Sequence, residues 1–594
     1  MLKGYYGKLL RINLSEQNYQ VENVPEEVYQ QYLGGKGLGT YLLLKYLSPG
    51  IHPFSPENIL IFTTGFTTGT NVFGSSRYGV FTKSPATGLY SESYSGGHVA
   101  PAIHATGYDA IMLEGAAKEP VYLEICDEKV AFHHAAHLWG QDTYRTEDII
   151  KKEIGKSKCQ ALVIGPAGEN LVCFACIENN YWRSAGRTGV GAVMGSKKVK
   201  GMVFYGNARV EIANPDLLKE LNKETAEIGK DHPGVLAYRT YGTTQMVRAL
   251  NRNKAFPARY WSQGSVDNWE DISGDALLEN FDVKNTACAR CFISCGKTST
   301  VRKGKYQGLT LEGPEYETIY SFGGLCCIKN LDEIIYLNDI CDRLGMDTIS
   351  AGNLIGLVME ATEQGRNIPV KLTYGDGEGA GRLLEDIAYR RGAGAVLAKG
   401  IKQTAEEWSL EDLAVHSKGL EPGGYDPRTL KGMGLQYAAS VRGAVHVNAW
   451  LYKPELAGLI DRKSVTGKAQ MFIEMENRYA IFHAGTLCIF FRDLYDWPQL
   501  VKMVKAITDW DYNEEKLNLI GHRIITAARM FNAREGATKN DDVLSARIHK
   551  LAINDGADAI SPEEVKFMID EYYRLRGWNE KGFSKTIALS DLCL

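Results

Sequence analysis

Three cysteines stand close together in the stretch NTACARCFISCGK, residues 285–297. Cys288, Cys291 and Cys295 are separated by two and then three residues. Thiolates at this spacing can bind a zinc ion or an iron–sulfur cluster, and both need a fourth ligand. Structural zinc usually takes its ligands as paired knuckles, which this stretch does not provide. Cationic and glycine neighbours favour a loop that stabilises thiolates over a buried cysteine face of a helix.

The fourth thiolate must come from elsewhere in the chain, which has 12 cysteines. In a large cytoplasmic protein, cysteines are more typical of cores and metal sites than of disulfides. The nearest plausible ligand is Cys488 in FHAGTLCIFFRDL, but Cys341 and Cys593 compete, and spacing alone does not decide. Cys173 and Cys176 form another C-x2-C in an alternating apolar segment. That segment predicts a strand, where the two side chains would point to opposite faces.

The elements that position these residues change character along the chain. Residues 1–210 contain short apolar or alternating runs separated by Gly, Pro, Asn and Ser, which predict strands. Helical periodicity begins at 214–230, after an Asn-Pro start, and dominates the remainder. We therefore expect an α+β fold, with an N-terminal β-rich domain and two mainly helical domains, 211–418 and 419–594. The Gly/Pro-rich stretch at 417–434 is the best candidate for the second boundary.

Composition places the chain among ordinary globular proteins. It has 594 residues, of which 44% are hydrophobic and 23% charged, with a formal net charge of −4. This charge gives no sign of a nucleic-acid or membrane surface. The start MLKGYYGKLLRINLS lacks the apolar region of a secretory signal, and no apolar run approaches the roughly 18 residues of a membrane span. We expect a cytoplasmic protein.

Five stretches together resemble a known family. They are LGGKGLG (33–39), RSAGRTGVGAVMGSKKVKG (183–201), LEGPEYETIY (311–320), CDRLGMDTIS (341–350) and YDPRTLKGMGLQYAASVRGAVHV (425–447). Their order and sequence are similar to those of the aldehyde:ferredoxin oxidoreductase family of tungsten-pterin enzymes, over essentially the whole chain. The resemblance implies a tungsten ion, or molybdenum, bound by two pyranopterins, and a nearby [4Fe–4S] cluster. The β-rich domain would form the base of this cofactor.

The resemblance also implies the ligands of the cluster. The family's motifs are C-x2-C-x3-C and a distant cysteine that ends a D-x-x-G-L-C motif. They match Cys288, Cys291, Cys295 and Cys488 in this sequence. Soft sulfur ligands suit such a cluster.

The family's first pterin motif, D-x-x-G-L-D, matches Asp342 to Asp347 with Gly345 between them. A carboxylate can accept two parallel hydrogen bonds from the amino and ring N–H groups of a pterin. A glycine after a helix can take the left-handed conformation that lets the backbone approach the cofactor. The alternative for this hexapeptide is a helix end with a capping glycine and a solvated aspartate.

The second pterin motif departs from the family pattern. His483 stands in place of the leading aspartate and Thr486 in place of the glycine, whereas Leu487 and Cys488 are retained. A neutral imidazole accepts only one hydrogen bond and does not replace a bidentate carboxylate. His483 is therefore a candidate pterin contact, and the alternative is a histidine whose hydrogen bonds are made locally.

Further cofactor contacts are implied in the β-rich domain. An arginine near the cofactor phosphates, a glycine turn and a Gly-rich loop with two cations are expected at Arg77, Gly96, Arg183, Ser184, Gly186 and Arg187. Tyr94 stands where the family often has Asn. The GGKGLG stretch lacks G-x-G-x-x-G spacing after a strand, which argues against nicotinamide binding.

Near the metal, the resemblance points to Glu317 and His446, whose side chains can move protons near neutral pH. Our hypothesis is that one of them takes the proton of an attacking water, with Tyr316 as a hydrogen-bond donor. Alternatively, Glu317 caps a helix or pairs with an arginine.

The leading functional interpretation is an oxidoreductase that oxidises an aldehyde to the carboxylic acid. Its electrons would leave through the [4Fe–4S] cluster to ferredoxin or a ferredoxin-like subunit, in a homodimer or hetero-oligomer. One alternative is the catalytic subunit of a tungsten-dependent aromatic acyl-CoA reductase complex. A second is an electron-transfer subunit without an active metal.

Overall fold

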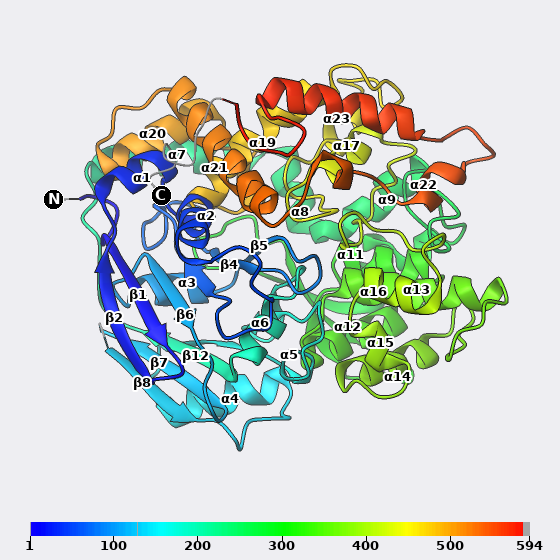
Figure 1. Ribbon diagram of the computed structural model, residues 1–594, viewed down its shortest axis with the longest axis horizontal. Helices are drawn as coiled ribbons and strands as arrows, with labels where there is room; N and C mark the ends of the chain where they lie inside the picture. Colours follow the sequence, from blue (N-terminus) through cyan, green and yellow to red (C-terminus); the bar gives the residue numbers. More distant parts are fainter. Residues whose placement is uncertain (1, 128, 586–594) are drawn as a thin grey trace.

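The computed structural model describes residues 2–127 and 129–585. Two six-stranded sheets lie in the N-terminal third of the chain (Figure 1). The first has the strand order β2-β1-β6-β3-β4-β5, and only its β1–β6 pair is parallel. Its strands are β1 (Lys8–Asn13), β2 (Asn18–Asn23), β3 (Leu60–Thr63), β4 (Tyr78–Lys83), β5 (Tyr90–Ser95) and β6 (Ala110–Glu114).

The second sheet has the order β11-β10-β9-β12-β7-β8, with β12 and β7 parallel. Its strands are β7 (Val121–Cys126), β8 (Lys129–His134), β9 (Gln160–Val163), β10 (Ile177–Asn179), β11 (Arg183–Ala185) and β12 (Val199–Tyr205). One apolar cluster joins the two sheets, with Leu10 and Phe62 from the first and Leu123 and Met202 from the second. This shared core holds the sheets together as one unit.

Within residues 2–127 and 129–206, six helices accompany these sheets: α1 (Glu26–Tyr32), α2 (Gly35–Tyr46), α3 (Val99–His104), α4 (Thr143–Ile154), α5 (Pro166–Glu169) and α6 (Val190–Ser196). Helix α2 begins within the GGKGLG stretch and packs against β3 and β4 on one side and against C-terminal helices on the other. Its Lys36 is buried, with its Nζ 2.9 Å from Glu92 Oε1. The GGKGLG stretch therefore packs within the core.

The remainder of the chain is mainly helical. Helix α7 starts as the sequence predicts, because the Asn214 side chain accepts from the Leu217 backbone N–H at 2.9 Å and Pro215 occupies the first turn. The α-helices before residue 420 are α7 (Pro215–Lys230), α8 (Pro233–Tyr241), α9 (Gln245–Arg252), α10 (Gly274–Asn280), α11 (Tyr316–Thr318), α12 (Leu331–Leu344), α13 (Thr348–Glu363), α14 (Gly377–Ala388), α15 (Gly394–Leu397) and α16 (Ile401–Trp408).

The later α-helices are α17 (Lys431–Ala439), α18 (Tyr452–Leu456), α19 (Lys468–Ala484), α20 (Trp497–Thr508), α21 (Glu514–Arg534), α22 (Ala546–Lys550) and α23 (Pro562–Arg576). Short 3-10 segments are η1 (Gly242–Thr244), η2 (Trp269–Ile272), η4 (Ile489–Phe491) and η5 (Lys539–Asp541), and η3 (Ile319–Leu325) is a π-helix. None of the helices in the described part of the chain combines the length and apolar character needed to cross a membrane.

The predicted fold class is confirmed: a β-rich N-terminal part precedes a mainly helical remainder. Two details differ. A three-stranded antiparallel sheet interrupts the helical part, formed by β13 (Phe281–Thr286), β14 (Gly296–Val301) and β15 (Thr310–Glu312). The segment with Cys173 and Cys176 is not a strand, because β10 begins only at Ile177.

The proposed boundary stretch at 417–434 is almost entirely buried. Domain boundaries usually lie in exposed linkers. The division at residues 418 and 419 stays a prediction.

Candidate functional site

The three clustered cysteines lie in the loop between β13 and β14, which agrees with the loop predicted for them. Lys297 lies just after the loop, and its Nζ donates to backbone carbonyl oxygens of α8 and of the loop, including Arg239 O at 3.0 Å and Cys295 O at 3.3 Å. A buried ammonium that satisfies several carbonyls fixes the end of this loop against α8. The loop is thus held in place by a cation that the sequence places two residues after Cys295.

Cys488 follows the C-terminus of α19 and reaches the same place. Its backbone N–H donates to Gly74 O at 2.8 Å, and the Gly74 N–H donates to Arg290 O at 2.8 Å. Gly74 thereby ties the segment of Cys488 to the loop of Cys288 and Cys291. The predicted fourth ligand and the other three are brought together by a residue of the β-rich domain.

All four cysteines line one cavity of about 300 Å³. Among the described residues, no group of three or more His, Cys, Asp or Glu is arranged to hold a single metal ion. Thiols that surround a volume in this way suit a polynuclear cluster better than one zinc ion. Cys341 does not line this cavity, and Cys593 lies outside the described residues.

Gly96, Arg77 and Arg183 also line the cavity that the four cysteines surround. A Cβ on Gly96 would lie 3.0 Å from Cys288 Sγ, so a larger residue would crowd this thiol. Arg183 forms an ion pair with Glu312. Burial opposes the charge of Arg77, but Cys488 and Cys288 outweigh it and raise the pKa of Arg77.

A second cavity, of about 360 Å³, adjoins the first. The residues that line both are Arg77, Tyr94, Trp182, Ser184, Glu312, Glu315 and Phe490. Arg77 was predicted from sequence to lie near cofactor phosphates, and the structure has it in the shared wall. A group bound in one cavity would therefore lie next to a group bound in the other.

The first pterin motif forms one side of the larger cavity. Asp342 lies in the last turn of α12 and accepts from Asn338 Nδ2 at 2.8 Å, and burial, with Glu178 nearby, raises its pKa well above the usual value. The alternative weighed for this hexapeptide holds for the helix end with its capping glycine but not for the solvated aspartate, because Asp342 and Asp347 are both buried. Gly345 has φ +76° and caps the helix without lining the cavity. Asp347 lines the cavity and caps α13.

The second motif presents a histidine without protein partners. His483 lines the larger cavity, and neither ring nitrogen has a hydrogen-bond partner among the described residues, although both are buried. The alternative of a locally satisfied histidine is therefore wrong. Its ring stacks on Tyr94, with centroids 4.4 Å apart. Burial, reinforced by Lys36, lowers the pKa of His483 to about 3, so the ring is neutral.

Thr486 and Leu487, the other residues of the second motif, have structural roles. Thr486 has φ +54°, close to the left-handed conformation of Gly345, and its hydroxyl lies 2.8 Å from Thr68 Oγ1. The hydroxyl contact holds a β-branched residue in a conformation that usually favours glycine. Leu487 is fully buried and lines neither cavity, so its expected role in binding a cofactor is not supported.

Strand β11 contributes Ser184 to the larger cavity, and the Gly-rich loop that follows β11 contributes Gly186 and Arg187. Ser184 Oγ donates to Glu178 Oε2 at 2.6 Å. Arg187 Nη1 donates to Asp347 Oδ2 at 2.8 Å, and its Nη2 donates to Glu421 O. The guanidinium of Arg187 is thus engaged by protein oxygens. This differs from the free cation that a phosphate site would need.

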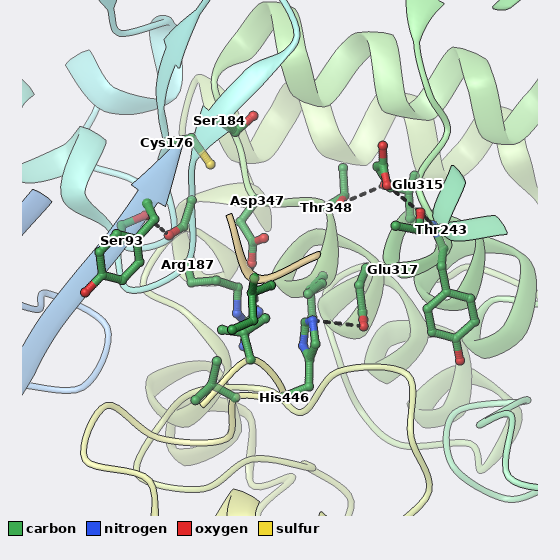
Figure 2. Close-up of a pocket in the computed structure, with 18 of the residues that line it drawn as sticks. Ser93, Cys176, Ser184, Arg187, Thr243, Glu315, Glu317, Asp347, Thr348 and His446 are labelled. Atoms are coloured by element: carbon green, nitrogen blue, oxygen red, sulfur yellow. Dashed lines mark hydrogen bonds and ion pairs between the residues drawn. The ribbon is translucent and has the colours of Figure 1, made fainter. Parts of the chain in front are cut away.

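Glu317 and His446 face each other in the same cavity, with Arg187 and Asp347 on the other side of the imidazole (Figure 2). Glu317 Oε1 is 3.4 Å from His446 Nε2, and Glu317 Oε2 accepts from the Gly424 N–H at 3.0 Å. The arginine pairing weighed for Glu317 is not formed.

Burial sets the protonation of this pair. It raises the pKa of Glu317 to about 8, against the opposing effects of the Gly424 N–H and Arg187. It lowers the pKa of His446 to about 3, with Arg187 and Arg442 acting in the same direction. At neutral pH the pair is a protonated carboxyl beside a neutral imidazole. Tyr316 also lines the cavity, but its hydroxyl donates to Gly424 O, so it positions the loop that binds Glu317.

Trp182 was missed by the sequence reasoning. It lines both cavities, and its indole N–H is buried without a partner among the described residues. Its position next to Arg183 in the Gly-rich stretch could have drawn attention to it. Cys173 and Cys176 line different cavities, although they do not lie in the strand from which their separation was predicted: Cys176 lines the larger cavity and Cys173 another one.

Comparisons with known proteins agree with this arrangement. The family model "Aldehyde ferredoxin oxidoreductase, N-terminal domain" matches residues 9–206, and "Aldehyde ferredoxin oxidoreductase, domains 2 & 3" matches residues 220–594. The tungsten-containing aldehyde ferredoxin oxidoreductase of Thermococcus kodakarensis is 38% identical over 593 residues, covering 98% of this chain and 97% of the relative. The Pyrococcus furiosus protein of the same name is 37% identical with the same coverage.

Two more distant proteins are also similar. The WOR-like subunit of an aliphatic sulfonate oxidoreductase from Pyrococcus furiosus is 29% identical over 630 residues, covering 99% of this chain and 97% of the relative. A chain in the solved structure of the active site complex BamBC of benzoyl coenzyme A reductase, with bound 1,5-dienoyl-CoA, superposes with a TM-score of 0.86. It is 26% identical and covers 100% of this chain and 98% of that chain.

Proposed function

The chain belongs to the aldehyde ferredoxin oxidoreductase family, and from this premise we propose that it oxidises an aldehyde to the carboxylic acid. It is an oxidoreductase whose cofactors are a tungsten ion bound by two pyranopterins and a [4Fe–4S] cluster. The observation that carries the proposal is the pair of adjoining cavities, one lined by four cysteines and the other by Glu317 and His446.

The residues of both cavities fit these cofactors. Four thiols around about 300 Å³ are the donor set of a cubane cluster, and Arg77 offers a compensating positive charge. In the larger cavity, His483 and Trp182 have buried nitrogens without a hydrogen-bond partner among the described residues. A polar ligand with both donors and acceptors would satisfy them. Asp342 and Asp347 can accept from pterin N–H groups, although Asp347 already accepts from Arg187.

Oxidation of an aldehyde by water yields a carboxylic acid, two protons and two electrons. When bound, the tungsten centre supplies a Lewis acid and a two-electron acceptor, and the cluster passes the electrons on one at a time. In our proposal, the ionised form of Glu317, which forms as the pH rises to its pKa of about 8, takes a proton from the attacking water at Oε1. This oxygen is buried and has no hydrogen-bond partner among the described residues. The neutral His446 ring, 3.4 Å away, orients the carboxylate.

Tyr316 has a supporting role in this scheme. Its hydroxyl donates to Gly424 O, and the Gly424 N–H donates to Glu317 Oε2. The phenol thereby positions the peptide that holds the carboxyl, rather than donating directly to a substrate.

We further propose that the electrons pass to a ferredoxin or a ferredoxin-like subunit, and that the protein works in the cytoplasm. The names of the relatives from Thermococcus kodakarensis and Pyrococcus furiosus, both aldehyde ferredoxin oxidoreductases, support the ferredoxin assignment. The benzoyl-CoA reductase complex and the WOR-like subunit support assembly with another subunit.

Reduction of an aromatic acyl-CoA is the second candidate, favoured by the high structural similarity to benzoyl-CoA reductase. The aldehyde assignment is preferred because identity to the aldehyde enzymes reaches 38%, against 26% for that reductase. Purification without oxygen, followed by assays with a panel of aldehydes and a viologen acceptor, separates the two. Viologen reduction with aldehydes supports our assignment. Its absence, with benzoyl-CoA reduction by a low-potential donor, would support the second.

A further inference from the structure

A groove with a cationic rim lies beside the cysteine loop. We call it the Arg290 groove: it encloses about 630 Å³ and is lined by Gly69, Thr70, Asn71, Arg209, Val210, Ile212, Pro215, Asp216, Leu218, Lys219, Asn222 and Arg290. These residues come from the β3–β4 loop, the segment before α7, the start of α7 and the cysteine loop. None of these residues lines either of the two cavities described above.

Three positively charged side chains that line the groove have no partner among the described residues. Arg209, Lys219 and Arg290 are exposed, and their side chains form no ion pair or hydrogen bond within residues 2–127 and 129–585. Asp216 is the one acidic residue among the lining residues. In a chain with a net charge of −4, three unpaired cations around one groove are a local excess of positive charge.

Other residues that line the groove are apolar or carry uncharged polar groups. Val210, Ile212 and Leu218 contribute apolar surface, and the Asn222 side-chain oxygen is buried without a partner within the described residues. An apolar centre with a polar, charged rim is the anatomy of a protein–protein interface. A free side-chain acceptor in such a groove offers a further contact to a donor group of a partner.

The groove is connected directly to the cysteines. Arg290 stands between Cys288 and Cys291 in the sequence, and its carbonyl accepts from the N–H of Gly74. Gly74, at the end of the loop that lines the groove, also accepts from the Cys488 N–H. A partner seated on the groove would thus contact the loop that holds Cys288 and Cys291, and Gly74 connects this loop to the segment of Cys488.

We propose that the Arg290 groove is the docking site for a separate electron-carrier protein, an iron–sulfur ferredoxin whose surface around its own cluster is acidic. This rests on the proposed function, because it gives the electrons of aldehyde oxidation their exit. Two molecules of the carrier each take one electron, which balances the two electrons released per aldehyde. Electrostatic attraction at the rim raises the encounter rate, and the polar character of the contact keeps it transient.

The test reverses the charge of two cations of the groove that lie outside the cysteine loop. Arg209→Glu combined with Lys219→Glu is compared with Arg145→Glu, an exposed arginine on α4, which lies well apart from α7 in Figure 1. Aldehyde-dependent reduction of a purified acidic [4Fe–4S] ferredoxin is measured at low salt, alongside reduction of methyl viologen. Binding of the same ferredoxin is measured by titration calorimetry without substrate.

We expect the double variant to lower kcat/KM for ferredoxin by at least about tenfold and to weaken binding in parallel. Viologen reduction should stay at the level of the unmodified protein, and the loss should shrink as ionic strength rises towards about 0.5 M. Arg290→Glu should reproduce the binding defect from the other side of the groove.

Equal ferredoxin reduction and binding by the double variant and the Arg145→Glu control would overturn the docking site. Ferredoxin binding that ignores salt would do the same. Loss of viologen reduction in the unmodified protein would instead contradict the proposed function, and the calorimetric comparison would still decide the docking site.

Discussion

The imidazole of His483 and the phenol ring of Tyr94 stack with centroids 4.4 Å apart and planes 16° from parallel. Both residues depart from the family pattern, and they come from β5 and α19. The Tyr94 hydroxyl donates to Glu92 Oε2 at 2.9 Å. Burial opposes ionisation of Glu92, but Lys36 and Arg442 outweigh it and hold its pKa at about 2. A neutral histidine thus rests on an aromatic ring fixed by a buried carboxylate.

This stack leads to a prediction for His483→Leu. Two buried nitrogens without protein partners destabilise the protein, so removing them should leave the stability of cofactor-free protein unchanged or raise it by about 1 kcal/mol. The same change should lower the tungsten content, because the imidazole is lost as a cofactor contact. His483→Asp should retain tungsten. Thermal unfolding and metal analysis check both parts; a markedly lower melting temperature with full tungsten content would show a purely structural histidine.

The pH profile should reveal Glu317. Burial raises the pKa of its carboxyl to about 8, so the group is protonated below that pH and becomes a base only above it. We expect kcat with viologen to rise about tenfold per pH unit between about pH 6 and pH 8 and to level off above. His446, with a pKa of about 3, stays neutral across this range. A flat profile in the unmodified enzyme would assign the base to His446.

Gly423 keeps the space behind this pair open. A Cβ at this position would lie 2.6 Å from His446 Nδ1 and 3.1 Å from Glu317 Oε2. Gly423→Ala should therefore displace the imidazole and lower kcat by at least about tenfold, while tungsten and iron contents stay unchanged. Gly88→Ala is the control: its Cβ would meet no atom within 4 Å, and its φ of +71° adds only local backbone strain. Wild-type kcat in Gly423→Ala would contradict the proposed role of the pair.

Cys488 can be separated from the other cysteines. Cys488→Ala should lower the iron content and abolish electron delivery to ferredoxin, because three thiolates leave one corner of the cluster without its ligand. Cys173→Ala, a buried cysteine that lines a different cavity, is the matched control and should keep its iron. Iron analysis and the low-temperature electron paramagnetic resonance spectrum of the reduced protein check this. A complete cluster in Cys488→Ala would remove it from the ligand set.

The sequence predicted much of this architecture for physical reasons. Asn214 and Pro215 begin a helix because of capping, and the D-x-x-G-L-D spacing marks a helix end with a left-handed glycine. The β13–β14 hairpin was missed because its strands, FDVKNT and GKTSTV, carry mostly polar residues and little apolar alternation. The glycines and prolines at 417–434 predict a domain boundary, and two of these glycines also permit close packing, Gly423 against Glu317 and His446 and Gly424 against Tyr316.

Contacts between distant segments were beyond sequence reasoning. The spacing and periodicity of the residues do not predict that the ring of Tyr94 stacks on His483. They also do not predict that the backbone of Gly74 forms hydrogen bonds with both Arg290 and Cys488. These contacts depend on how α19 packs against α2 and the first sheet. The burial that raises the pKa of Glu317 also comes from several segments at once.

The most direct test of the central claim is a paired measurement on Glu317→Gln and the unmodified protein, both purified without oxygen. Tungsten, iron and aldehyde-dependent viologen reduction are determined on the same samples. We predict about one tungsten and about four irons per chain in both proteins, with turnover only in the unmodified one. Turnover by Glu317→Gln at the unmodified rate would contradict the proposed role of Glu317. Iron without tungsten in an inactive unmodified protein would contradict the tungsten-dependent oxidation of an aldehyde.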